Sequence, residues 1–135
     1  MTSVDDVLSQ VATVSGYLET AGWLVSWHDG HPEDNEIGYE GDHREGPFSD
    51  ESYDHAEQAL QDFVDALDDP NDVIVYVDSM GYEQLGHDLW LTRNGHGAGF
   101  WDRGLGALGD RLTEAARSLG EAMAYVDTDD VVHVE

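Results

Sequence analysis

The chain has 135 residues and no cysteine, so it can fold as one domain with a hydrophobic core but cannot form disulfides or thiolate metal sites. Its 30 acidic residues stand against five arginines and no lysine, and the net charge of −25 argues against direct binding to nucleic acid or to an anionic membrane. The hydrophobic content of 40% predicts a folded protein rather than a disordered acidic tail.

Two interpretations of the charge compete. Adaptation to molar salt explains the chain-wide lack of lysine, because the long apolar stem of lysine suits a strongly hydrated surface poorly and self-repulsion is screened within about 3 Å. Mimicry of nucleic acid is the other interpretation, since 25 charges match roughly 40 Å of duplex DNA. The two are compatible, and the absence of lysine favours salt adaptation as the main cause.

The N-terminal segment lacks the basic start and unbroken apolar stretch of a signal peptide. No run approaches the roughly 18–20 apolar residues of a membrane span. We therefore expect a soluble cytoplasmic protein, located in the host cytoplasm if the chain is viral.

The first predicted element is an amphipathic helix that begins at a Thr2 or Ser3 cap and ends near Gly22. Residues 23–27 fit either a short strand or a continuation of this helix. The stretch 28–50 is rich in Gly, Pro, Asp and Glu, which predicts a long acidic loop.

A second helix is predicted from about Asp50 to Leu67, with Ser49 as its cap and a continuous apolar stripe. Residues 72–80 remain ambiguous, since their β-branched residues favour a strand while the preceding Asp-Pro pair favours a helix start. A third helix is predicted at about 107–119, followed by Gly120 as its terminator.

The segment His87–Arg103 is predicted to form a hairpin with Asn94-Gly95 as its tight turn. The C-terminal residues predict a second hairpin around Thr128-Asp129-Asp130. The expected fold is a single α+β domain over residues 1–135, with three helices packed on a small antiparallel sheet that contains the central Asn-Gly hairpin.

The central hairpin is the candidate binding surface because it concentrates aromatic, basic and imidazole side chains. Its members are His87, Asp88, Trp90, Arg93, Asn94, His96, Phe100, Trp101, Asp102 and Arg103. A pair of His87 or His96 with Asp88 or Asp102 would suit general-base chemistry. The preferred interpretation is an internal hydrogen-bond network that holds the glycine-rich turn. One aromatic side is expected in the core, and the other could bind a protein.

Other chemical signatures are weak. His28, Asp29, His31 and His43 match no metal-binding spacing and are expected to be exposed loop residues. The acids around Asp129 lack the glycine and terminal glutamate of a calcium loop, so a plain turn is expected. We predict no catalytic residue, no metal and no cofactor.

The run Gly86–Arg103, GHDLWLTRNGHGAGFWDR, resembles the signature of a family of small acidic proteins of phages, other mobile elements and their prokaryotic hosts. Leu89 stands where the family is expected to have Phe. The resemblance covers roughly residues 86–135, read as a hairpin–helix–hairpin region. It implies a virus-encoded or mobile-element accessory protein and no particular reaction.

The leading hypothesis is a small non-enzymatic accessory protein of a salt-adapted host's virus or mobile element, which binds a host or viral protein. Its sharpest form is a DNA mimic. One alternative is a small hydrolase-like enzyme that uses the His/Asp/Arg cluster of residues 87–103. Another is a structural or assembly protein, which a symmetric oligomer would favour. The oligomeric state itself is left open.

Overall fold

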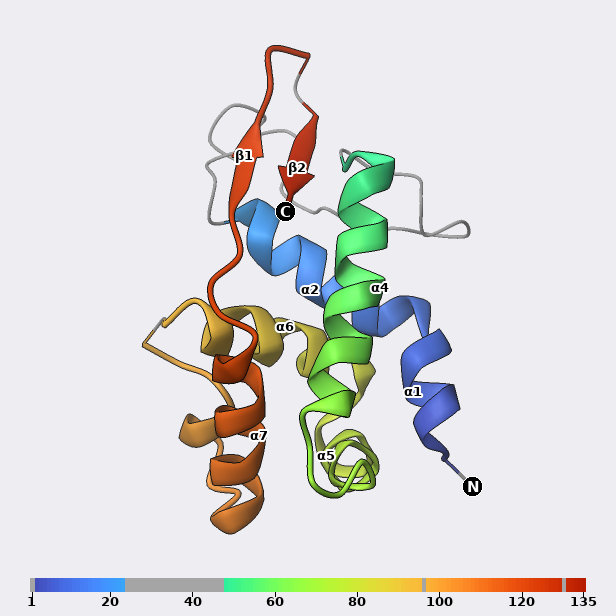
Figure 1. Ribbon diagram of the computed structural model, residues 1–135, viewed down its shortest axis with the longest axis vertical. Helices are drawn as coiled ribbons and strands as arrows, with labels where there is room; N and C mark the ends of the chain where they lie inside the picture. The colour runs from blue at the N-terminus through green and yellow to red at the C-terminus, as the bar shows by residue number, and fades with distance from the viewer. Residues whose placement is uncertain (1, 24–47, 96, 130) are drawn as a thin grey trace.

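A computed structural model describes residues 2–23, 48–95, 97–129 and 131–135 (Figure 1). The described part contains six α-helices, one 3-10 turn and a two-stranded antiparallel sheet, so the chain is mostly helical. The predictions for residues 24–27, for the loop with His28, Asp29, His31, His43 and Arg44, and for His96 lie outside the described residues.

The elements follow one another as α1 (Val4–Ser9), α2 (Val11–Trp23), α4 (Asp50–Asp65), α5 (Asp72–Met80), α6 (Tyr82–Arg93), η1 (Phe100–Asp102), α7 (Ala107–Ser118), β1 (Ala124–Val126) and β2 (Val132–Val134). In Figure 1 the helices form the body of the molecule and the sheet extends from one end of it. The α+β class is confirmed in this coarse form, whereas the expected three helices are too few.

The N-terminal helix is broken in two. Ser3 caps α1 as predicted, because its hydroxyl accepts from the Asp6 amide while the Asp6 carboxylate accepts from the Ser3 amide. Gln10 then adopts an extended conformation with ψ 122°, and α2 begins at the next residue. The apolar periodicity continues across this break, which is why the sequence predicts one helix.

The predicted helix at 50–67 is confirmed by α4, and Ser49 accepts a hydrogen bond from the Ser52 amide as its cap. The ambiguous residues 72–80 are the helix α5. The third predicted helix is confirmed by α7. Gly120 follows its end with a positive φ of 75°, the conformation that favours glycine after a helix.

The predicted central hairpin is wrong. Its first half is the helix α6, and its second half contains only the short turn η1. Asn94-Gly95 does form a turn, but at the end of a helix, where the Gly95 amide donates to the Thr92 carbonyl and φ is 69°. The sheet therefore does not contain this segment.

The burial pattern of α6 explains the error. Four of its six buried residues, Leu85, Asp88, Leu89 and Thr92, recur at the three- and four-residue spacing of a helix. Two of these four side chains are polar, so no apolar helical stripe is visible in the sequence.

The C-terminal hairpin is confirmed. β1 and β2 pair antiparallel with Ala124 opposite Val134 and Val126 opposite Val132. Val132 and Val134 are buried, and the sheet contacts α2 and α4. It thus covers one end of the helical core.

α2 and α6 cross at very short range through two glycines. A Cβ on Gly86 would lie 2.0 Å from the Thr13 carbonyl oxygen, and one on Gly16 would lie 2.1 Å from the Glu83 carbonyl oxygen. Only glycine fits at either position. This crossing holds α6, which carries His87 and Asp88, against α2. None of the described helices is long and apolar enough to cross a membrane.

Candidate functional site

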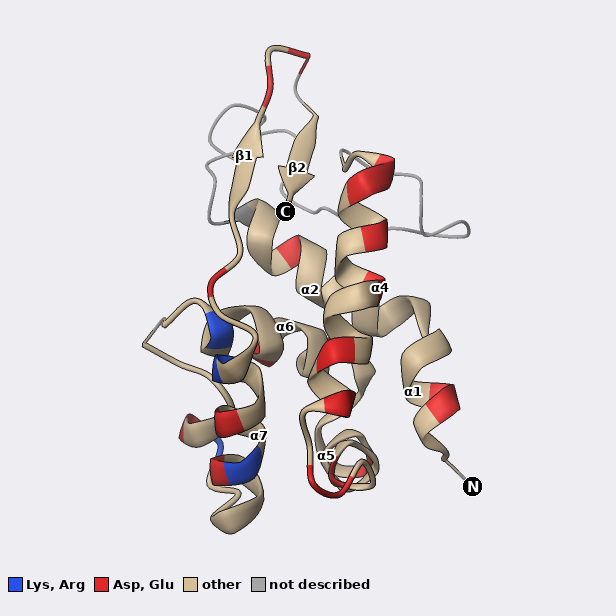
Figure 2. Cartoon of the chain, in the orientation of Figure 1, with Lys and Arg blue, Asp and Glu red and all other residues tan. Residues whose placement is uncertain are grey.

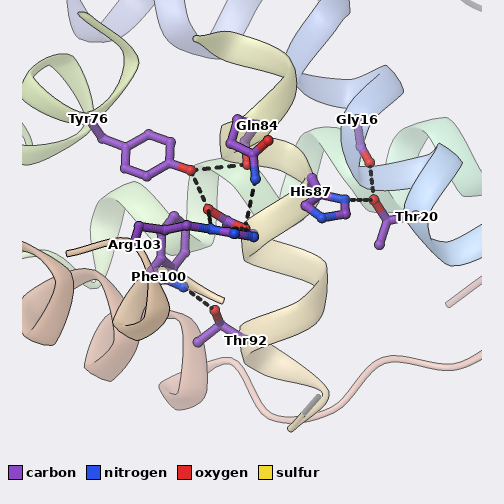
Figure 3. Close-up of polar contacts among 9 residues, drawn as sticks. Gly16, Thr20, Tyr76, Gln84, His87, Thr92, Phe100 and Arg103 are labelled. Carbon is purple, nitrogen blue, oxygen red and sulfur yellow. Dashed lines mark hydrogen bonds and ion pairs between the residues drawn. The ribbon is translucent and has the colours of Figure 1, made fainter. Parts of the chain in front are cut away.

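One face of α6 holds a buried carboxylate. The Asp88 side chain has no exposed surface, and Arg103 binds it through Nη2 at 2.7 Å and Nε at 3.2 Å. The Gln84 amide nitrogen donates at 3.1 Å, and the Tyr76 hydroxyl donates to the other carboxylate oxygen (Figure 3). We call Tyr76, Gln84, Asp88 and Arg103 the Asp88 network.

The electrostatics of the Asp88 network favour a permanent structure. Burial, with the hydrogen bond to Asp88, raises the pKa of Tyr76 far above its usual range, so the hydroxyl stays a neutral donor. The hydrogen bond to Asp88 also raises the pKa of Arg103. A carboxylate that is fully enclosed by three donors cannot receive a proton from a substrate.

Two further predicted site residues hold the chain after α7. The guanidinium of Arg93 donates to the carbonyl oxygens of Gly120 at 2.8 Å and Leu119 at 3.2 Å, which satisfies the end of that helix. Asn94 accepts from the Ala122 amide at 2.9 Å and donates to the Trp90 carbonyl oxygen at 2.9 Å. These contacts account for Arg93 and Asn94 as structural residues.

The predicted aromatic residues divide between core and surface. Phe100 is buried, with its ring centroid 5.5 Å from that of Phe63, and Trp90 packs edge-on at 5.2 Å against Tyr17. Trp101, in contrast, is 44% exposed. Of the candidate residues that the structure describes, only Trp101 and Asp102 are exposed; the others are buried or half-buried.

The adjoining face of α6 borders a cleft of about 650 Å³ between α2, α6 and the end of α5. We call it the His87 cleft; it is lined by Gly16, Glu19, Thr20, Met80, Glu83, Gln84, His87 and Leu91. His87 is the only one of these that the sequence predicted as a site residue. The others share helix faces, since residues 83, 84, 87 and 91 repeat on α6 and residues 16, 19 and 20 on α2. This pattern was not recognised because the sequence predicted a strand, not a helix, from residue 87 onward.

The protonation of His87 follows from its neighbours. Thr20 Oγ1 lies 2.7 Å from the Gly16 carbonyl oxygen and 2.8 Å from His87 Nδ1 (Figure 3). A carbonyl oxygen can only accept, so the single hydroxyl proton of Thr20 is donated to Gly16. The Thr20 oxygen therefore accepts from His87, whose Nδ1 carries the proton and whose Nε2 keeps a lone pair.

Burial lowers the pKa of His87, so the neutral ring prevails at neutral pH. The direction of the Thr20 hydrogen bond argues against nucleophilic catalysis, because an activated hydroxyl must donate to the histidine. Within the described residues, His87 and Asp88 do not form the His–Asp pair of the hydrolase hypothesis, since His87 Nδ1 is bonded to Thr20 and Asp88 belongs to its own network.

A second histidine site lies on α4, at His55. Tyr17 accepts from Arg93 Nη1 at 3.0 Å, so its hydroxyl proton faces His55 Nε2 at 2.7 Å. Burial raises the pKa of Tyr17 to about 12, and burial together with the positive charge of Arg93 lowers the pKa of His55 to about 4. His55 is therefore an uncharged acceptor at neutral pH, and no motif in the sequence marks it as a site.

Metal ligation finds no support in the described part of the chain, where no three His, Asp or Glu side chains converge. The Asp127 carboxylate accepts from the Asp129 and Val131 amides and lies 2.7 Å from His133 Nε2. These contacts build the turn between β1 and β2, as the sequence predicted.

Comparisons of the chain with protein-family models, with curated proteins and with solved structures found no match. The phage and mobile-element resemblance therefore stays a prediction.

Proposed function

We propose that the chain is a non-enzymatic accessory protein that acts by binding a basic protein surface. The distribution of charge carries this proposal. Among the described carboxylates only Asp72 and Asp88 are buried, and each is bonded to an arginine, Arg111 or Arg103. Arg93 is committed to carbonyl oxygens of the chain itself, so most described positive charge is used internally and the exterior is acidic (Figure 2).

The most regular acidic surface lies on α4, away from the arginines, which gather around α7 in Figure 2. We call it the α4 acidic face; its exposed residues are Asp50, Glu51, Asp54, Glu57, Asp62 and Asp65. A helix rises about 1.5 Å per residue, so these carboxylates extend over about 22 Å of the helix axis. Their average separation along the axis is about 4.5 Å. This spacing is comparable with the roughly 3.4 Å between phosphates along one DNA strand, which supports a DNA mimic as the specific form of the proposal.

The biological setting is part of the same proposal. The lysine-free composition supports a salt-adapted host, and the resemblance of residues 86–103 supports a virus or mobile element as the source. The hydrolase-like alternative is weaker, because the Asp88 network is closed. An assembly role would require a symmetric oligomer in solution.

The test compares two fourfold charge-neutralised variants. The first changes the α4 acidic face by Glu51→Gln, Asp54→Asn, Glu57→Gln and Asp62→Asn. The matched control removes four exposed acids elsewhere by Asp78→Asn, Asp110→Asn, Glu114→Gln and Glu121→Gln. Each protein is immobilised and exposed to a lysate of a salt-adapted prokaryote at low salt and at molar KCl, and bound proteins are challenged with duplex DNA.

We expect the wild type and the control to retain DNA-binding proteins that duplex DNA releases, and the α4 variant to retain fewer. If no DNA-binding protein is retained at either salt and none is displaced from DNA, mimicry fails. Equal losses in both variants would show that only overall charge matters and would remove the α4 acidic face from the proposal.

A further inference from the structure

The His87 cleft lies apart from the α4 acidic face, and no residue of α4 lines it. Its volume of about 650 Å³ falls within the range typical of small-molecule sites, roughly 300–1,000 Å³. The close α2–α6 crossing at Gly16 and Gly86 sets the separation of the two helices that form most of its walls. A concave site with a few specific polar groups is the usual arrangement for ligand recognition.

The polar groups of the cleft are arranged as acceptors. Because His87 Nδ1 carries the proton that is donated to Thr20, Nε2 has a free lone pair, and no described residue donates to it. The Gln84 amide nitrogen is bonded to Asp88, so the side-chain oxygen points away from the Asp88 network (Figure 3). A ligand that fits these atoms must therefore bring hydrogen-bond donors.

The charge of the cleft is negative. Glu19 and Glu83 line it, His87 is neutral, and no arginine is among its described lining residues. Met80 and Leu91 add an apolar wall. A bare metal ion does not suit the cleft, since no three metal-ligating side chains converge in the described part of the chain. Among the described lining residues, the polar side-chain atoms left for an anion are acceptors, including the Glu19 and Glu83 carboxylates.

The geometry points to a binding site for a small organic cation. A protonated primary amine or a guanidinium group donates to His87 Nε2 and pairs with the Glu83 carboxylate, while its carbon chain packs on Met80 and Leu91. This chemistry is available from a free small molecule or from a basic side chain of a partner. The site is separate from the proposed partner surface on α4 and does not depend on it.

Isothermal titration with two probes distinguishes these sources: agmatine as the free cation, and a blocked Gly-Arg-Gly peptide as the side chain. We expect saturable one-to-one binding of at least one probe. Glu83→Gln should weaken it about tenfold, the usual scale for losing one charge-assisted contact. Glu121→Gln removes the same charge at an exposed position outside the cleft and should leave binding unchanged.

Two further measurements keep the test independent of folding defects. Leu91→Trp fills the cleft without changing charge and should abolish binding. In the wild type, nitrogen NMR should show His87 protonated at Nδ1, with the Nε2 signal shifting as the probe is added. The fourfold α4 variant should bind the probe normally, so failure of the partner proposal would not affect this one.

The inference is overturned if neither probe saturates, or if Glu121→Gln weakens binding as much as Glu83→Gln. Butanesulfonate, an anion of similar size, should not bind; equal binding of this anion would also overturn it. Binding of the peptide but not of agmatine supports the site and identifies a partner side chain as its source.

Discussion

Residues 87 and 88 are adjacent in the chain but lie in different environments. Asp88 is fully buried and its carboxylate accepts from Tyr76, Gln84 and Arg103, while His87 borders an open cleft and keeps one ring nitrogen without a described partner. Both sit on α6, about 100° apart around its axis. The closed face maintains the fold, and the open face is available to a ligand.

This difference shows how to interpret a dense polar motif. Residues 87–103 are rich in His, Asp, Asn and Arg, yet most of these side chains bind the protein itself. Burying a carboxylate requires several donors, and those donors account for much of the motif. His87 is the residue that remains available to a ligand, because its Nε2 atom has no described hydrogen-bond partner.

The largest effect should come from breaking the Asp88 network. Arg103→Leu leaves the buried Asp88 charge without its main partner, and we expect a loss of about 3–5 kcal/mol in the free energy of unfolding. Urea denaturation followed by circular dichroism measures it. Adding Asp88→Asn to this variant should recover part of the loss, because the uncompensated charge is then gone. A loss below about 1 kcal/mol would show that solvent reaches Asp88.

The next largest effect concerns the helix crossing on which both faces depend. Gly86→Ala places a methyl group 2.0 Å from the Thr13 carbonyl oxygen, so α2 and α6 must separate. We expect a loss of about 3 kcal/mol, measured by thermal and urea unfolding. Gly97→Ala is the matched control, because no atom lies within 4 Å of its added Cβ. Equal losses would contradict the close crossing.

The sequence predicts some elements well because local signals agree with burial. α4 and α7 have clear apolar stripes, and Ser49 and Gly120 mark a start and an end that the structure confirms. The C-terminal hairpin is likewise predicted by its short β-branched strands around a polar turn. In these segments the solvent-facing and core-facing positions differ in polarity.

α6 could not be predicted in this way, because Gly86 and Asp88 occupy positions where a helix normally places apolar side chains. Their meaning depends on partners distant in sequence: Thr13 fills the space at Gly86, and Arg103 neutralises Asp88. The His87 cleft was missed for the same reason, since three of its eight described lining residues come from α2.

A smaller effect should appear in the pH dependence of the free energy of unfolding. His55 has a pKa lowered from 6.5 to about 4, so between these pH values the unfolded chain binds a proton that the folded chain does not. The free energy of unfolding therefore decreases as the pH falls through this window. His55→Gln keeps an acceptor for Tyr17 but cannot titrate. Between pH 6.5 and pH 4 the free energy of unfolding should decrease in both proteins. Because His55 is partly exposed, we expect the decrease to be about 1–2 kcal/mol smaller in the variant than in the wild type.

The measurement is a series of urea denaturations across this pH range, in which the slopes of the two proteins are compared. Protonation of the many surface carboxylates affects both proteins equally and cancels in the difference. Parallel pH profiles would contradict a proton-excluding environment for His55.

The smallest effect on stability should come from the open face. His87→Leu removes the hydrogen bond to Thr20, but the Thr20 hydroxyl keeps its bond to Gly16 and its vacated lone pair is accessible to water from the cleft. We expect a loss of about 1 kcal/mol, the usual net value of one hydrogen bond, measured by urea denaturation beside Arg103→Leu. The ion pair of Asp88 and the hydrogen bond of the adjacent His87 would then differ several-fold in their contribution to stability. Of these two residues, only His87 would affect cation binding. A loss as large as that of Arg103→Leu would instead make His87 part of the core, because the energy would have to come from packing that an open cleft does not provide.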